Sequence, residues 1–242
     1  RGPCDGSHRT INRLDAGRLS PGDGCLAHVI GLYDGGLLAA DASVGRLLDA
    51  LRDRPRWRNT VVLITSDHGE AFLEHGRMEH NSTLFSEMLH VPFILRLPPS
   101  HQVTALDTDR LVTLADIKPT LLGAAGLSSH RTMDSFNLLE AGAVPEGRFM
   151  IGQTATKPSI HGIRSLRWNM MINAAGSGAL FDLAADPWEV DNRRSRDPSR
   201  YAGLGMILAT RIGMPPQLVV SDGTADITEE ERALLESLGY LR

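Results

Sequence analysis

The sequence lacks cysteine-rich motifs and long hydrophobic runs. Its 242 residues include only two cysteines, Cys4 and Cys25, which form neither a CxxC pair nor a zinc-site spacing. A disulfide between them stays open, but two free thiols are the favoured interpretation, so the cysteines do not fix the redox compartment. No apolar run approaches the roughly 20 residues that a bilayer-crossing helix needs, so the sequence predicts no transmembrane segment.

A strong charge bias is also missing. The formal net charge is -4, with neither a basic stripe nor an acidic tail, which argues against a nucleic-acid partner. Residues 1–8 contain neither an initiator Met nor an apolar signal region, so we expect a fragment or a processed piece of a longer protein. Apolar residues make up 42% of the chain, enough for a substantial core.

The first part of the chain predicts an α/β arrangement. Residues 1–24 are rich in Gly, Pro, Asp and Arg and indicate a loop. Apolar residues at intervals of three and four then predict a long amphipathic helix over 26–51, with a flaw expected at Gly35-Gly36. The β-branched run at 61–65 is typical of a strand buried on both faces. Shorter elements are predicted as a helix at 84–89, strands at 91–97 and 111–114, and a helix over 116–122 capped by Asp116.

The pattern changes near residue 140 to shorter segments. Four strands of a small antiparallel sheet are predicted at 149–151, 162–166, 169–173 and 179–182. Helices are predicted around 201–212 and, after a capping box at 228–231, up to residue 238. The sequence therefore predicts three parts: an N-terminal loop segment (1–24), an α/β core portion (25–140) and a C-terminal α+β subdomain (141–242).

Polar residues that suit metal binding follow the buried strand directly. Asp67 and His68 stand where the strand at 61–65 ends, the place where open α/β sheets gather ligands. A carboxylate and an imidazole suit a divalent cation, and Gly69 lets the backbone turn away. The alternative is a loop-capping aspartate, with His75 and His80 merely solvated and Glu70, Glu74 and Glu79 facing water.

The order of these pieces resembles the sulfatase family of the alkaline-phosphatase superfamily. The resemblance runs from about residue 28 to the end of the chain. It is carried by these segments: Ser66-Asp67-His68-Gly69-Glu70, Glu74-His75-Gly76, 84–94, Asp116-Ile117-Lys118-Pro119-Thr120-Leu121-Leu122, Leu180-Phe181-Asp182-Leu183 and Leu238-Gly239-Tyr240-Leu241. It implies a partial alkaline-phosphatase-like α/β/α sheet sandwich, followed by a small α+β subdomain with an antiparallel sheet.

The resemblance also implies roles for three residues. Asp67 and His68 match metal ligands of the family, with Ca²⁺ favoured and Mn²⁺ or Zn²⁺ as alternatives. His80 matches the residue that contacts the leaving oxygen of the ester. The implied substrate is a small-molecule or glycan sulfate ester, hydrolysed with the help of a divalent metal.

The nucleophile of the family does not appear in this sequence. Neither Cys4 nor Cys25 stands in the Cys/Ser-x-Pro/Ala-x-Arg setting, and the family's earlier pair of Asp ligands is also missing. We therefore expect a catalytically incomplete C-terminal portion whose partner is the missing N-terminal half, and a sheet left open and apolar on one edge or face. Two alternatives stay open: a phosphate or phosphonate ester hydrolase of the same superfamily, which His68 favours, and a non-catalytic remnant or binding module.

Overall fold

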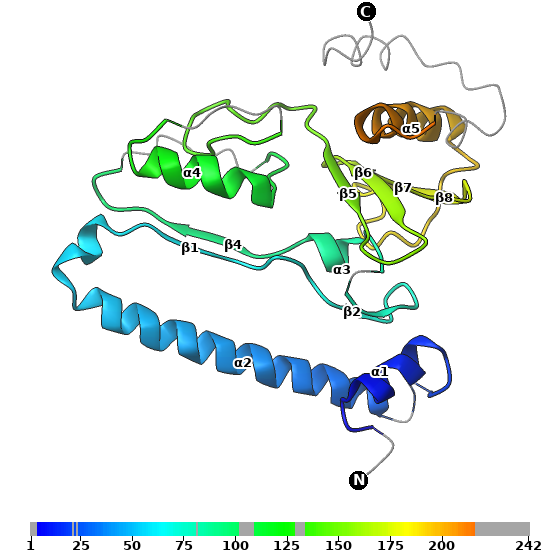
Figure 1. Cartoon of the computed structure of the whole chain (residues 1–242), viewed down its shortest axis with the longest axis horizontal. Coiled ribbons are helices and arrows are strands. Elements are labelled where there is room, and N and C mark those ends of the chain that lie inside the picture. Colours follow the sequence, from blue (N-terminus) through cyan, green and yellow to red (C-terminus); the bar gives the residue numbers. More distant parts are fainter. Residues whose placement is uncertain are drawn as a thin grey trace, which may run out of the picture. The chain divides into compact units, whose positions relative to one another are not determined.

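The structure, a computed structural model, describes residues 4–20, 22, 24–80, 82–101, 109–128 and 134–215 (Figure 1). The chain forms two compact units that alternate in the sequence. The first unit comprises Arg1–His80 and Glu87–Gln102, and the second comprises Asn81–Ser86 and Val103–Arg242. The division into parts near residue 140 stays a prediction. The last predicted helix, which follows the capping box at 228–231 and extends to residue 238, lies outside the described residues.

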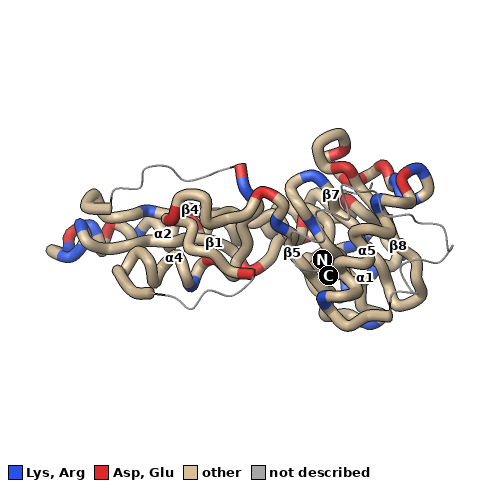
Figure 2. The backbone as a smooth tube through the Cα atoms, turned by 90° about the horizontal axis from the view of Figure 1, so that it is seen from above, with Lys and Arg blue, Asp and Glu red and all other residues tan. Residues whose placement is uncertain are grey.

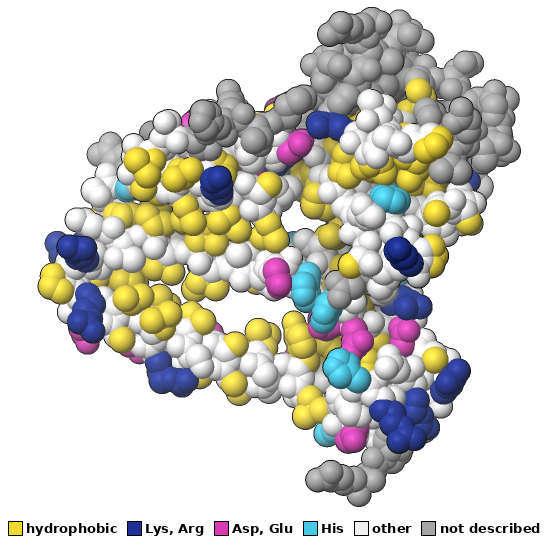
Figure 3. All heavy atoms as spheres, viewed as in Figure 1, with side chains coloured by type: hydrophobic (Ala, Val, Ile, Leu, Met, Phe, Trp, Pro, Cys, Tyr) yellow, Lys and Arg dark blue, Asp and Glu magenta, His cyan; other side chains and the backbone are white. Residues whose placement is uncertain are grey.

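The long helix of the first unit is confirmed. Helix α2 spans Cys25–Arg52 without a break at Gly35-Gly36, since flanking leucines and alanines favour the helix enough to offset the entropic cost of glycine. Only Cys25 and Val29 are buried. Figure 3 shows hydrophobic side chains exposed along α2. The large hydrophobic residues exposed on this helix are Leu32, Tyr33, Leu37, Leu38 and Leu47, so much of its apolar surface is open to solvent.

Two predicted strands of the first unit pair with each other. Strand β1 (Val62–Thr65) runs antiparallel to β4 (Phe93–Arg96) in a two-stranded sheet. The β1 residues are half-buried rather than fully buried, which corrects the expectation of burial on both faces. Both outer edges of this sheet lack a partner strand among the described residues, and Ile94 is 58% exposed, in line with the expected open sheet.

A short 3-10 helix connects α2 to β1. It spans Pro55–Asn59, so the chain leaves α2 at the proline expected to end it. The guanidinium of Arg96 donates to the carbonyl of Thr60 at 2.7 Å and lies over the Trp57 ring, 3.9 Å from its centroid. This contact fixes the start of β1 to the end of β4.

The N-terminal segment is not the expected loop. Helix α1 spans His8–Asp15, and the side chain of Ser7 caps it by accepting from the backbone N–H of Thr10. Leu14 of this helix is buried in a small core with Cys25, Val29 and Met78. The sequence did not reveal this helix for two reasons. Gly, Pro and Asp are abundant in this segment, and only two positions in α1 are buried, so its apolar pattern is weak.

The two cysteines form a disulfide, which corrects the expectation of free thiols. Cys4 lies before α1 and Cys25 is the first residue of α2, 21 residues later. Sequence spacing alone could not reveal the bond, because α1 and the turn after it bring the two residues together. The bond closes the loop that contains α1 and holds this short helix against α2.

A small hairpin follows β1. Strands β2 (Ala71–Phe72) and β3 (Met78–Glu79) are antiparallel, with Ala71 opposite Glu79. A hairpin with two paired positions is marginal by itself. Burial of Met78, together with the bond from its backbone N–H to Asp15 at 2.8 Å, anchors the hairpin to α1. The short helix α3 (Ser86–Leu89) begins two residues later than predicted.

The second unit confirms the predicted antiparallel sheet. Its strands occur in the order β5-β6-β7-β8 and span Met150–Gln153, Ile160–Arg164, Trp168–Asn173 and Gly178–Asp182. Helix α5 (Pro198–Ile212), predicted around 201–212, covers one face of this sheet (Figure 1). Ile163, Met170 and Leu180 of the sheet and Leu208 of α5 are fully buried in their shared core.

A buried carboxylate fixes residues 84–86 to this sheet. Glu189 is 1% exposed and accepts from the backbone N–H and the hydroxyl of Ser86, at 2.7 and 2.6 Å. Its other oxygen accepts from Arg164 at 3.1 Å and Asn169 at 2.5 Å. With four donors around it, this carboxylate is saturated and serves the fold.

A second buried ion pair corrects two expectations for residues 111–122. The predicted strand at 111–114 is absent from the described structure there, and Leu114–Asp116 form a 3-10 turn that precedes α4 (Ile117–Ala124). Asp116 makes no side-chain cap to α4. Instead it receives two bonds from Arg148, at 2.6 and 2.9 Å, and both side chains are buried. Removal of one partner of such a buried ion pair strongly destabilises a fold.

The charges are mixed along the chain of each unit. Figure 2 shows basic and acidic residues interspersed, with no long segment of one sign. None of the described helices is long and apolar enough to cross a membrane.

We expect the Cys4–Cys25 bond to stabilise the first unit. Replacing both residues (Cys4→Ser with Cys25→Ser) should lower its free energy of unfolding by about 3 kcal/mol, since a cross-link over a loop of this length restricts the unfolded chain. Urea unfolding followed by circular dichroism measures the change. The reduced natural chain is the control and should match the double variant. An unchanged unfolding midpoint in both would contradict the prediction.

Candidate functional site

The candidate site begins where the chain leaves β1. The hydroxyl of Ser66 donates to the carbonyl of His68 at 2.7 Å, and Asp67 Oδ1 accepts from the backbone N–H of His68 at 3.1 Å. These local bonds replace the sheet ladder at the point where β1 ends. The alternation of side chains along a strand therefore lapses, and Asp67 and His68 can face the same side.

Gly69 fixes this turn to α3. Its backbone N–H donates to the carbonyl of Met88 at 2.9 Å. A Cβ at residue 69 would lie 1.9 Å from the carbonyl oxygen of Glu87, a distance that no real side chain tolerates. The sequence predicted that glycine eases the turn, and the structure adds that glycine is needed for this close backbone approach.

Asp67 and His68 face each other as expected for two ligands of one ion. His68 Nδ1 lies 2.8 Å from the carbonyl oxygen of Gly69, and since a carbonyl only accepts, Nδ1 carries the proton in this contact. The lone pair of the neutral ring is then on Nε2, which lies 3.8 Å from Asp67 Oδ2. Fixing one ring nitrogen by a backbone carbonyl is the usual way in which proteins orient a metal-binding histidine.

The distance between these two atoms fits a single small cation. Zinc–nitrogen and zinc–oxygen bonds are about 2.0–2.2 Å long, so one ion can touch two atoms 3.8 Å apart. The carboxylate of Asp67 is 86% exposed, so its outer oxygen is open to a ligand. Among the described residues, no group of three or more His, Cys, Asp or Glu side chains could hold a metal ion. The pair by itself can supply two ligand atoms to a cation.

His80 joins these two residues. Its ring stacks on the His68 ring, with centroids 4.3 Å apart and planes inclined by 27°. His80 Nδ1 lies 3.2 Å from Glu70 Oε2. The structure therefore brings together all three residues that the sequence singled out, Asp67, His68 and His80. Figure 3 shows histidine and acidic side chains gathered near the part of the first unit that carries β2 and β3.

Glu70 is a site residue that sequence reasoning assigned to solvent. Its side chain is about one-fifth exposed and holds His80. The register of the β2–β3 hairpin explains the contact, because pairing of Ala71 with Glu79 places residue 70 opposite residue 80. A hairpin prediction around Gly76 would have revealed this pair, but strands of two residues give almost no periodic signal.

His75 binds a second carboxylate. Its Nδ1 lies 2.8 Å from Glu87 Oε1, and both side chains are largely buried. This pair ties the tip of the hairpin to α3, the helix whose backbone also receives the Gly69 N–H. His75 thus contributes to the position of the hairpin, a role that the sequence did not specify.

The arrangement supplies two kinds of chemistry. The Asp67 carboxylate and the His68 lone pair can hold a cation. The Nε2 atom of His80 can donate or accept a proton, since Glu70 occupies its Nδ1. A cation and a nearby proton donor are the groups that stabilise negative charge developing on a leaving oxygen.

Comparisons with known proteins point to one family and one fold. A sequence model described as Sulfatase matches residues 3–127. Arylsulfatase K of Gallus gallus is 28% identical over 195 residues, and the match covers 72% of this chain and 35% of that protein. The solved structure of a 2-O GAG sulfatase superposes with a TM-score of 0.70 at 22% identity, covering 95% of this chain and 51% of that chain.

A phosphonate ester hydrolase shares the fold. The phosphonate monoester hydrolase of Agrobacterium radiobacter superposes with a TM-score of 0.61 at 24% identity, covering 85% of this chain and 45% of that chain. The chain thus spans about a third of the length of the curated relative and about half of each solved chain. At these identities the solved structures show a shared fold and no more. The sequence model matches more than half of the 242 residues.

We expect Gly69→Ala to disrupt the turn that carries Asp67 and His68. The added Cβ would collide with the carbonyl of Glu87, so the free energy of unfolding should fall by about 2–4 kcal/mol. Gly45→Ala on α2 is the matched control. It meets no atom within 4 Å and should stabilise the chain by about 0.5–1 kcal/mol. Urea unfolding measures both, and equal effects of the two substitutions would refute the prediction.

Proposed function

The chain belongs to the sulfatase family, and from this premise we propose that it supplies the metal-binding and leaving-group portion of a sulfate ester hydrolase. Its fold is the alkaline-phosphatase-like α/β fold of that family, followed by a small antiparallel subdomain. The observation that carries the proposal is the facing of Asp67 and His68 at the end of β1, with His80 stacked on His68.

Asp67 and His68 would hold the divalent cation. The family resemblance favours Ca²⁺, with Mn²⁺ and Zn²⁺ as alternatives. The Asp67 carboxylate suits all three ions, whereas the imidazole of His68 suits Zn²⁺ best. When bound, the cation withdraws electron density from an ester oxygen and so favours cleavage of the adjacent bond. The bond between His68 Nδ1 and the Gly69 carbonyl leaves Nε2 facing Asp67 Oδ2, where it would be available to the ion.

His80 would act on the leaving group. As the ester bond breaks, negative charge develops on the departing oxygen, and a protonated imidazole within reach neutralises it. Glu70 holds Nδ1 of His80, and stacking on His68 fixes the plane of the ring. His80 is therefore the proposed general acid, and Glu70 is a positioning residue.

The attacking nucleophile would come from a companion segment that carries the Cys/Ser-x-Pro/Ala-x-Arg motif. Two surfaces of the first unit support this idea. Leu37, Leu38 and Leu47 are exposed on α2, and the β1–β4 sheet has no further partner strand among the described residues. Burial of exposed apolar side chains and pairing of an open sheet edge are strong driving forces for association. The proposed partner is the N-terminal half of the family fold.

The proposed substrate is a sulfated glycan or a small aryl sulfate. Support comes from the 2-O GAG sulfatase and Arylsulfatase K, whose names refer to such substrates. A phosphate or phosphonate ester is the second candidate. It is favoured by His68 and by the shared fold of the phosphonate monoester hydrolase. A non-catalytic module that retains only the fold is the third alternative.

We expect the natural chain to bind Mn²⁺ weakly through Asp67 and His68. Two ligands should give a dissociation constant of roughly 10⁻⁴–10⁻³ M, in the range of weak cation sites. Asp67→Asn and His68→Gln should each weaken binding about tenfold or more in isothermal calorimetry. The control, Asp49→Asn on the exposed side of α2, removes the same charge and should leave binding unchanged. Equal affinities in all four proteins would exclude the proposed ligand pair.

We expect the chain alone to hydrolyse neither an aryl sulfate nor an aryl phosphate at an appreciable rate with added Ca²⁺ or Mn²⁺. Removing a covalent nucleophile typically costs several orders of magnitude in rate. Release of nitrophenol from the two esters measures turnover. Turnover with either ester, abolished by Asp67→Asn, would show that the chain contains its own nucleophile and would overturn the proposed division of labour.

A further inference from the structure

Helix α1 holds the strand that leads to His80. The carboxylate of Asp15, the last residue of α1, accepts from the backbone N–H of Met78 at 2.8 Å, and its other oxygen lies 3.3 Å from Nη2 of Arg77. Met78 is 4% exposed and packs in the same small core as Leu14 of α1. Because β3 ends at residue 79, these contacts fix the chain directly before His80.

The residue between Met78 and His80 has a strained backbone. Glu79 has a φ of +62°, a left-handed conformation that is costly for a residue other than glycine and persists only where its surroundings enforce it. Glu79 pairs with Ala71 of β2, and its carboxylate lies 3.0 Å from Nδ1 of His8, the first residue of α1. The pair with His8 is exposed and therefore weak, so the hold on β3 depends mainly on the other end of α1. Without that hold, residue 79 can relax and change the direction in which His80 leaves the strand.

The Cys4–Cys25 bond keeps α1 in this place. A helix of eight residues is marginal by itself in water, and only two positions of α1 are buried. The bond joins the segment before α1 to the first residue of α2. Next to Cys4, the carboxylate of Asp5 accepts from the hydroxyls of Ser7 and Thr10, at 2.6 and 2.8 Å. The disulfide therefore acts on a segment that is itself bonded to the beginning of α1.

We propose that Asp15 is a positioning residue for His80, the general acid of the proposed function, on which this assignment rests. Because α1 carries Asp15, reduction of the Cys4–Cys25 bond releases His80 from its place against His68. A dithiol reductant supplies the two electrons and two protons that convert the bond into two thiols, and is itself oxidised to a disulfide. Helix α1 then loses its covalent link to α2, its hold on β3 weakens, and the two rings no longer stack.

The experiment measures the contact between the two rings in the full chain. Nuclear Overhauser effects between the ring protons of His68 and His80 report the stacking, whose centroid distance is 4.3 Å. His68→Gln and His80→Gln assign the two rings among the nine histidines, with all spectra recorded at one pH. The natural, oxidised chain should give this signal. Neither a cation nor an ester is added, so a failure of the proposed hydrolysis leaves the test intact.

Three substitutions test the assignment of Asp15. Asp15→Ala should weaken the ring signal at least about threefold, because the His80 ring then spends most of its time away from His68. Asp15→Asn retains an oxygen that accepts from the N–H of Met78, so it should retain the signal. Asp49→Ala removes the same charge from the exposed side of α2 and should change nothing.

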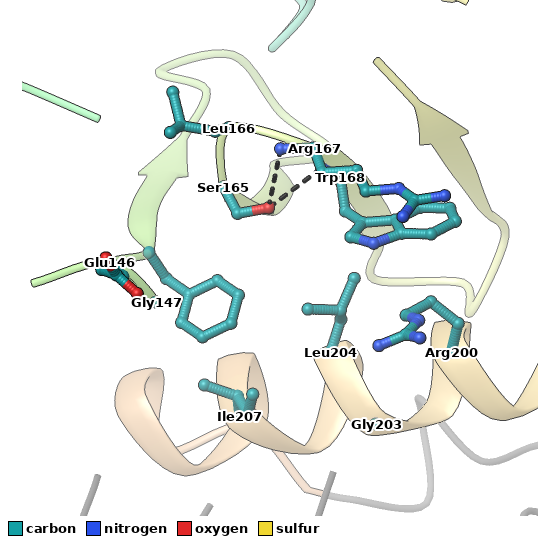
Figure 4. A pocket seen from close by; sticks show the side chains of 11 residues that line it. Glu146, Gly147, Ser165, Leu166, Arg167, Trp168, Arg200, Gly203, Leu204 and Ile207 are labelled. Carbon is teal, nitrogen blue, oxygen red and sulfur yellow. Dashed lines mark hydrogen bonds between the residues drawn. The ribbon is translucent and has the colours of Figure 1, made fainter. Parts of the chain in front are cut away.

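Loss of the disulfide should have the same effect as Asp15→Ala. Cys4→Ser with Cys25→Ser, and the natural chain treated with dithiothreitol, should each lose the signal at a temperature where circular dichroism shows a folded chain. A control for lost stability comes from the second unit, where Leu204 lines a cavity with Trp168 and Ile207 (Figure 4). Leu204→Ala enlarges this cavity and should lower the urea midpoint while it leaves the ring signal unchanged.

The proposal is overturned if the natural chain shows no contact between the rings. It is also overturned if the contact survives Asp15→Ala or loss of the disulfide in a folded chain, because α1 then only stabilises the first unit. A third contrary outcome is an equal loss of signal in Asp15→Asn, Asp49→Ala or Leu204→Ala.

Discussion

The candidate site depends on the close approach of two backbone segments. The N–H of Gly69 bonds to the carbonyl of Met88, and the Glu87 carbonyl fills the space that any side chain at residue 69 would need. This contact sets the direction in which the chain leaves β1, and hence where Asp67 and His68 point. The Glu87 side chain also pairs with His75, which lies in the β2–β3 hairpin that brings His80 back to the site. One short helix thus positions both sides of the site.

The parts that the sequence predicted well are those with strong local signals. The periodic apolar residues of α2 and the β-branched run of β1 favour one structure with little help from the rest of the chain. The same holds for the four strands of the second unit, where turn residues separate apolar segments. Asp67 and His68 could be singled out from the sequence because a polar pair directly after such a strand has a fixed place in α/β folds.

The parts that the sequence did not predict depend on contacts between distant residues. The Cys4–Cys25 bond needs α1, a helix with only two buried positions. The Glu70–His80 pair needs a hairpin whose strands are too short for a periodic pattern. Asp116 was expected to cap α4 by its position, but it completes the capping box of the preceding 3-10 turn and binds Arg148, 32 residues later. Such tertiary partners override local preference wherever burial makes an unpaired charge costly.

Asp67 differs from two buried carboxylates of the chain, and this difference supports the proposed site. Asp116 and Glu189 are buried and surrounded by donors from arginine, serine, asparagine or the backbone, so they have no capacity left for a ligand. Asp67 is highly exposed, and its Oδ2 faces Nε2 of His68. The other ring nitrogen of His68, Nδ1, is bonded to the carbonyl of Gly69. Two buried acids are thus satisfied within the fold, whereas Asp67 and His68 lie together near solvent, where the pair could bind a cation.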